Sequence, residues 1–186
     1  MDEEFRPFDN DCIWYFIILA VATIIVAWIF VLVGCFAKLD PCRDKCEQPW
    51  PLNLVTWEYA PQNVVIYILW SAAILFYLWG SNHATCIDTI SDERRLIYRA
   101  IYAGVMLLMV ADFLLFFVFH HVSGALTANI LGLVLIIGAV FLYSEIDIDD
   151  GWAAVPLMLW FAYRSYTLYY IIGHNPDLSS PDVRLQ

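Results

Sequence analysis

Two charged side chains lie inside stretches of sequence that are otherwise apolar. Asp112 lies within residues 96–119 and Arg164 lies within residues 152–172. A charge in the hydrocarbon of a bilayer costs about 2.5–3.5 kcal/mol on insertion scales, so it usually faces a bundle interior and has a partner. Both residues are expected about 10–12 Å from the same end of the bundle, because a helix rises 1.5 Å per residue. We predict an Asp112–Arg164 ion pair inside the bundle; in the alternative, each side chain reaches separately to a headgroup or water.

The last apolar stretch also carries a stripe of aromatic and polar residues. Its members recur in steps of four and three, which places them on one helix face: Pro156, Trp160, Tyr163, Thr167 and Tyr170. Aromatic side chains that also donate a hydrogen bond suit a ligand pocket better than lipid. Trp50 and Trp57, in a proline-rich connection, could fold over such a pocket. The alternative is that each Trp anchors the chain at a membrane interface.

The composition indicates that the stretches around these residues lie in a membrane. The chain is 62% hydrophobic and only 15% charged, whereas soluble domains carry about 25% charged residues. Stretches of about 20 apolar residues are long enough to cross a bilayer as helices, and they occur at residues 13–36, 63–80, 96–119, 125–144 and 152–172. We therefore predict an all-α membrane protein, a bundle of five transmembrane helices, with an acidic tail at residues 1–12 and a second tail at residues 173–186.

Connections and small residues predict how the helices pack. The turns after residues 119 and 144 are short, so the last three helices should be antiparallel neighbours. Small residues that recur on one helix face let helices approach closely in lipid, and the fourth stretch offers Ala125, Ala128, Gly132 and Ala139. We expect ordinary packing within the bundle there, although such a face, like that of the first stretch, also permits a homodimer.

Charge and motif content exclude several classes of function. The formal net charge of −10 argues against nucleic-acid binding, which needs clustered basic residues. No pattern places a nucleophile beside a base, so we expect no enzyme, no cofactor and no metal site. The five cysteines have no regular spacing, which favours free thiols. A Cys42–Cys46 disulfide or metal site is the alternative.

Several short motifs together resemble one known family. Residues 57–61 (WEYAP) are similar to that family's W-V-F-G-P, and Tyr67 falls at the Tyr of a following L-Y. Similar matches occur at Trp50-Pro51 (W-x-P-P), residues 123–131 (P-G-L-A-L-V-D-I-L), residues 156–160 (P-Y-L-x-W) and Asn175. In order and spacing, these motifs resemble the translocator protein / tryptophan-rich sensory protein family, also called the peripheral benzodiazepine receptor family.

The resemblance implies a binding protein rather than an enzyme. Its ligand is expected to be flat and apolar, a tetrapyrrole (porphyrin) or a sterol-like molecule, with a role in tetrapyrrole or lipid transport. The ligand-binding residues expected in the bundle pocket are Trp50, Trp57, Tyr67, Asp112, Phe113, Trp160, Tyr163, Arg164 and Thr167. The family also implies the mitochondrial outer membrane or endoplasmic reticulum in eukaryotes, or the cell envelope in bacteria.

The sequence departs from the family at places that bear on the ligand. Val110, Phe113 and Leu115 replace the helix 3 motif N-x-x-W-S-P, and Ile172-Gly173 replaces the W-R that supplies the basic residue of a cholesterol-recognition pattern. Arg164 falls where the family has a small residue facing the pocket. Its guanidinium could exclude neutral ligands, or recruit an anionic one such as a porphyrin carboxylate. A membrane scaffold that has lost the ligand site is therefore the alternative function.

Overall fold

The chain folds as a bundle of helices. The computed structural model describes residues 14, 16–25, 28–29, 61–86 and 90–175, with only the backbone described for residues 61–67. The described helices are an amino-terminal apolar helix, Phe16–Ile25, then α2 (Pro61–Cys86), α3 (Asp92–Phe113), the π-helical turn η2 (Leu114–Val118), α4 (Val122–Ser144) and α5 (Ile148–His174). The all-α prediction is confirmed for this part of the chain.

Each of the later helices begins a few residues before the apolar stretch that predicted it. The reason is local capping, because polar side chains start the helix ahead of the hydrocarbon-compatible residues. Ser91 accepts a hydrogen bond from the Arg94 amide in α3, and Asp147 accepts one from the Asp149 amide in α5. The His121 Nδ1 atom accepts from the Gly124 amide at 2.9 Å and caps α4.

Two of the described helices are long and apolar enough to cross a membrane. They are the continuous segments Asp92–Val118 and Val122–Ser144. A helix of about 20 residues matches the thickness of the hydrocarbon core. Five crossings, and the boundaries of the tails, remain predictions.

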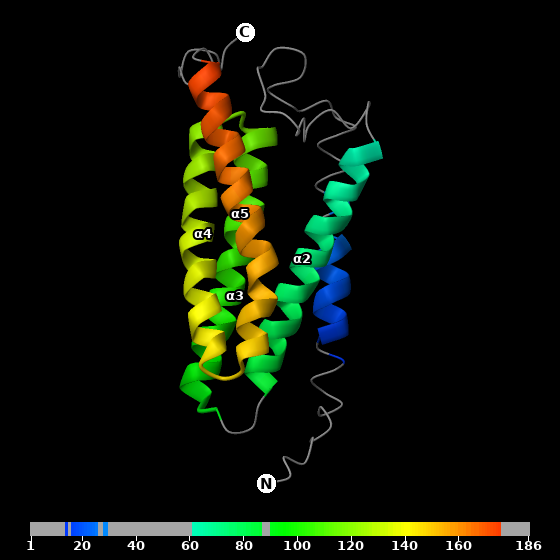
Figure 1. Ribbon diagram of the computed structural model, residues 1–186, viewed down its shortest axis with the longest axis vertical. Coiled ribbons are helices and arrows are strands. Elements are labelled where there is room, and N and C mark those ends of the chain that lie inside the picture. The colour runs from blue at the N-terminus through cyan, green and yellow to red at the C-terminus, as the bar shows by residue number, and fades with distance from the viewer. Residues whose placement is uncertain (1–13, 15, 26–27, 30–60, 87–89, 176–186) are drawn as a thin grey trace.

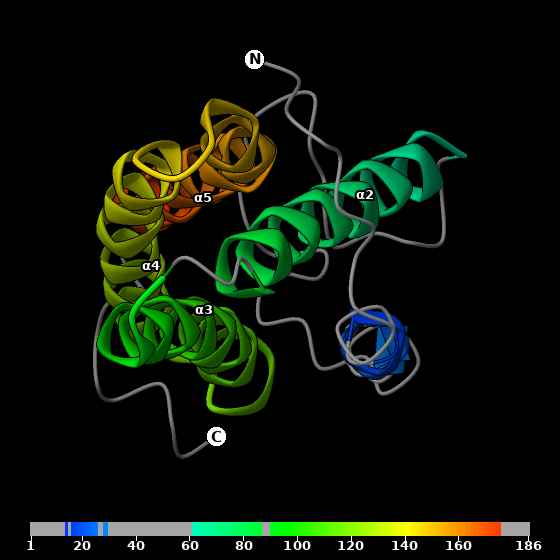
Figure 2. The ribbon, with the colours of Figure 1, turned by 90° about the horizontal axis from the view of Figure 1, so that it is seen from below.

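Sequential helices lie side by side. Helices α3, α4 and α5 run antiparallel to their sequence neighbours, as predicted, and α4 packs most extensively on α5. Helix α2 packs mainly against α5 and diverges from it toward Pro61 (Figure 1). The amino-terminal helix stands apart from α4 and α5 when the bundle is viewed from its end (Figure 2). Thr23 joins this helix to α3 by a 3.2 Å hydrogen bond with Tyr102.

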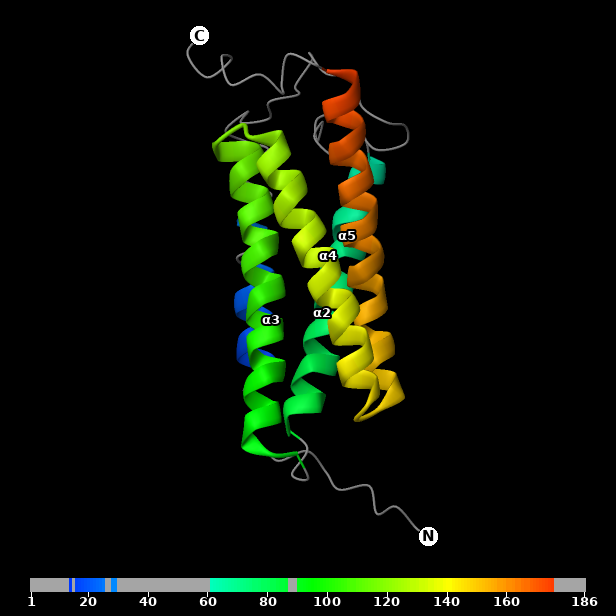
Figure 3. The ribbon, with the colours of Figure 1, turned by 90° about the vertical axis from the view of Figure 1, so that its left-hand side faces the viewer.

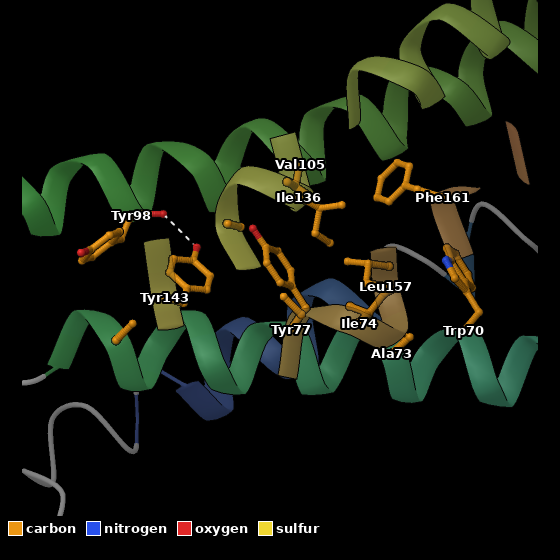
Figure 4. Packing of buried hydrophobic residues seen from close by; sticks show 13 residues of the cluster. Trp70, Ala73, Ile74, Tyr77, Tyr98, Val105, Ile136, Tyr143, Leu157 and Phe161 are labelled. Carbon is orange, nitrogen blue, oxygen red and sulfur yellow. Dashed lines mark hydrogen bonds between the residues drawn. The ribbon is translucent and has the colours of Figure 1, made fainter. Parts of the chain in front are cut away.

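The buried apolar residues form two clusters. The larger cluster extends along the bundle from Tyr98 and Tyr143 to Trp70 and Phe161 (Figure 4). The smaller cluster lies where α3 ends and α4 begins, and consists of Phe116, Phe117, Val122, Ala125, Leu168 and Ile171. The candidate site lies between the two.

Small residues on α4 are used for packing within the bundle. Ala125, Ala128, Gly132 and Ala139 are all buried. At Gly132 an added Cβ atom would lie 2.4 Å from the Phe161 Cε1 atom, so only glycine admits this ring. The expectation of ordinary bundle packing is confirmed for α4, and this face is therefore not available to a second copy of the chain.

The prediction of free thiols is wrong for one cysteine. Cys86, at the end of α2, is disulfide-bonded. The other four cysteines lie outside the described residues, Cys42 and Cys46 included. Irregular spacing concealed this bond because the fold, rather than sequence proximity, brings cysteines together.

A polar clamp joins the end of α2 to the start of α5. The Asp150 carboxylate is fully buried. It accepts a hydrogen bond from the His83 Nδ1 atom, which lies 2.9 Å from Oδ1 and 2.8 Å from Oδ2. An ionised carboxylate cannot donate, so Nδ1 carries the proton. The Trp79 ring stacks on His83 with centroids 5.8 Å apart. Burial raises the pKa of Asp150 to about 6, although the His83 hydrogen bond opposes the shift.

Replacing Gly132 by Ala should destabilise the bundle by about 1–3 kcal/mol, because the new methyl group overpacks against Phe161. Gly138 is the matched control, since an added Cβ there meets nothing within 4 Å. Gly138→Ala should leave the melting temperature unchanged or raise it, because Ala is the better helix former. Thermal unfolding of the purified variants in detergent measures both, and equal melting temperatures would contradict the packing account.

Stability should depend on pH through Asp150. Its pKa in the folded chain is about 6 against an ordinary 3.8, so between these values the folded state binds the proton more tightly than the unfolded state. The contribution of this residue to stability therefore rises as pH falls from about 7 to about 4, by up to about 3 kcal/mol. Asp150→Asn should remove this rise in melting temperature, whereas the exposed neighbour variant Asp149→Asn should keep it. An unchanged pH profile in Asp150→Asn would contradict the account.

Candidate functional site: a buried ion pair between two apolar clusters

The predicted ion pair forms. The Arg164 Nε atom on α5 donates to the Asp112 Oδ2 atom on α3 at 3.2 Å. The two residues are only 6% and 7% exposed, respectively. Because neither side chain reaches solvent on its own, the alternative of separate snorkelling is wrong. The pair links α3 to α5 inside the bundle, near the end of α3 where η2 begins.

Helix α4 contributes the second layer of this site. The Asn129 Nδ2 atom donates to the same Asp112 Oδ2 atom at 2.9 Å, and the Ser165 hydroxyl donates to the Asn129 Oδ1 atom at 3.3 Å. Asn129 is itself buried. Three helices thus share one polar network, and each of its residues restrains the others.

The guanidinium also contacts an aromatic ring. The Arg164 Cζ atom lies 4.6 Å from the centroid of the Phe116 ring. A cation over an aromatic face is attracted to it, and the attraction is stronger away from water. Phe116 belongs to the π-helical turn η2 that follows Asp112 and Phe113 directly. The wider turn is therefore part of how α3 presents both the acid and this ring, and such turns are frequent at functional sites.

Three aromatic rings, two from α5 and one from α2, lie in contact beyond the ion pair. Trp160 on α5 lies 5.8 Å from Trp70 on α2 and 6.3 Å from Tyr163, measured between ring centroids. Trp160 precedes Arg164 by one helical turn, a rise of about 6 Å. Trp160 therefore lies about one helical turn from the ion pair along α5.

The predicted stripe on α5 borders the packed face of that helix. Pro156 is exposed, Trp160 and Tyr163 are half-buried, and Thr167 bonds back to the Tyr163 carbonyl at 3.1 Å. The buried face of α5 is made by Leu157, Phe161, Arg164, Leu168 and Ile171, together with Thr167 from the stripe. The stripe therefore runs along the border of the packed face, and its role in lining a ligand pocket stays a prediction.

The remaining predicted residues are not brought together with this group. Phe113 packs into the smaller cluster, with its ring 4.4 Å from that of Phe117. Trp50 and Trp57 lie outside the described residues, and so does the side chain of Tyr67.

The residues missed from sequence are mainly Trp70, Phe116 and Ser165. Trp70 lies in a long apolar stretch, and the sequence there does not distinguish a Trp that packs in the bundle from one that anchors the chain at a membrane interface. Phe116 follows the buried acid by four residues, a spacing that shares a helix face in an α-helix, and that signal was available. The Ser165 contact depends on the rotation of α5 against α4.

The charges of this network sum to zero. Asp112 and Arg164 compensate each other, and the described residues around them offer hydrogen-bonding groups and flat apolar rings. No nucleophile lies beside a general base among the residues of this site.

Removing one member of the ion pair should lower the free energy of unfolding far more than removing both. Arg164→Met or Asp112→Leu alone leaves a buried unpaired charge and should cost about 3–5 kcal/mol. The double variant replaces the pair by apolar side chains and should recover most of that loss. Unfolding of the four proteins in detergent gives the coupling energy, and strictly additive losses would contradict a direct pair.

Comparison with known proteins adds one firm result. The model of the TspO/MBR family matches residues 22–173. No curated protein and no solved structure matches the chain. The family match covers helices α2 to α4, all of α5 except its last residue, and the ion-pair site. By this match the chain belongs to the TspO/MBR family, a family of membrane proteins.

Proposed function

We propose that the chain binds a flat, largely apolar ligand within its helix bundle, a tetrapyrrole or a sterol-like molecule, and takes part in its transport. The observation that carries the proposal is the position of the Trp70–Trp160 pair one helical turn from the buried Asp112–Arg164 pair. Apolar aromatic surface beside a few fixed polar groups is the usual make-up of a small-molecule site. Membership in the TspO/MBR family supports the same class of function.

Each part of the site has a distinct task in this proposal. The rings of Trp160 and Tyr163 offer faces on which a planar ligand can stack, a contact worth about 0.5–1.5 kcal/mol per aromatic pair. The ion pair supplies the polar group that fixes orientation. Trp50, Trp57, Tyr67, Phe113 and Thr167 complete the proposed set. The chain is proposed to reside in the bilayer with five crossings.

One observation favours a second candidate, a membrane scaffold without a ligand. The Arg164 guanidinium occupies space between α3 and α5, and the polar network around it is satisfied largely within the chain. In a scaffold, this network would serve only to hold three helices together. Stoichiometric ligand binding separates the two candidates.

Protoporphyrin IX should quench the Trp fluorescence of the detergent-purified chain saturably, with a dissociation constant on the order of micromolar. Trp160→Phe should weaken binding by about 3- to 10-fold, because it shrinks the stacking surface. Trp152→Phe is the matched control, since this Trp is on the same helix but 65% exposed. Linear quenching that neither variant alters would show only partition into detergent, and the scaffold would then be the better account.

A further inference from the structure

The disulfide bond of Cys86 has its partner in the same chain. Cys86 is the last residue of α2 and is disulfide-bonded. The structure holds one chain, so the partner is one of the four other cysteines, which lie outside the described residues: Cys12, Cys35, Cys42 and Cys46. A disulfide needs Cα atoms about 4.4–6.8 Å apart. The place of Cys86 in the fold therefore selects among the four.

The amino-terminal helix brings the chain near Cys12 to the level of Cys86. Thr23 bonds to the Tyr102 hydroxyl on α3 at 3.2 Å. Trp14 precedes Thr23 by nine residues and Asp92 precedes Tyr102 by ten, a rise of about 14–15 Å along either helix. Figure 1 shows that both helices start toward the end of the bundle where α2 ends. Cys12 is two residues from Trp14, at most about 7 Å of chain.

The other three cysteines follow the amino-terminal helix at its far end. Cys35 comes six residues after Ile29, and the remaining two come later still, before Pro61. Pro61 begins α2 and lies about 38 Å from Cys86 along that helix. A chain that returned from there to Cys86 would carry unpaired backbone groups across the hydrocarbon, which lipid does not tolerate. Connectivity therefore favours Cys12.

We propose that Cys86 is cross-linked to Cys12, which ties the start of the amino-terminal helix to the end of α2, and that this end of the bundle faces an oxidising compartment. The S–S bond forms as both thiols give up their protons, and the two electrons reduce the disulfide of a thiol oxidoreductase to a dithiol. Such bonds persist on the oxidising side of a membrane. The proposal is independent of the proposed function, because it involves no ligand.

The cross-link would complete the fastening of one end of the bundle. At that end, the His83–Asp150 hydrogen bonds already hold α2 to α5. The disulfide adds the amino-terminal helix to the same end of α2. Neither contact acts near Pro61, where α2 diverges from α5 (Figure 1).

The bond can be mapped in the full chain as cells make it. Free thiols are blocked with N-ethylmaleimide in intact cells, and the purified chain is digested with chymotrypsin without reductant. Cleavage after Trp14 and Phe36 separates Cys12 from Cys35, and Cys35 from the later cysteines. Mass spectrometry should find the fragment with Cys86 joined to the fragment with Cys12, and reductant should release it. Linkage of Cys86 to any other cysteine, or a maleimide-blocked Cys86, overturns the proposal.

Thermal unfolding in detergent tests the tether. Cys12→Ser should lower the melting temperature by about 5–10 °C, because the bond closes a long loop of the unfolded chain. Cys35→Ser is the matched control and should leave the melting temperature unchanged. Dithiothreitol should bring the wild type to the melting temperature of Cys12→Ser and should not lower that variant further. If Cys35→Ser rather than Cys12→Ser removes the effect of the reductant, the assignment is wrong.

Discussion

The structure depends on the pairing of two opposite charges in an apolar bundle. Asp112 and Arg164 come from helices that are not neighbours in sequence, and neither charge is tolerable there alone. Their contact therefore restrains the relative depth and rotation of α3 and α5. Asn129 extends that restraint to α4, which lies between them in the chain. A single polar network thus determines the register of three helices for which apolar packing alone is less selective.

Close packing follows from the same restraint. Once α5 is placed by Arg164, the Phe161 ring one turn earlier meets Gly132, where no larger residue fits. The other end of α5 is held independently, because Asp150 is clamped to His83 at the end of α2. Helix α5 is thus restrained at two heights by polar contacts and between them by aromatic packing. This arrangement leaves Trp160 at the side of α5 that faces Trp70.

For ligand binding, the notable property of this site is that it is neutral yet polar. The Arg164 guanidinium is neutralised by Asp112 within the network. The same neutrality explains how the network can persist in an apolar bundle.

Sequence alone determined the helical class, the antiparallel order of α3, α4 and α5, and the ion pair. Each follows from one-dimensional properties, namely apolar length, turn length and the depth of a charge along its helix. Only the tertiary structure decided which face of each helix is buried, because that depends on rotation about the helix axis. The stripe from Pro156 to Tyr170 therefore proved to border the packed face, whereas Trp70 and Ser165 acquired their roles through contacts with other helices. The disulfide at Cys86 belongs to the same category, since it requires cysteines brought together by folding.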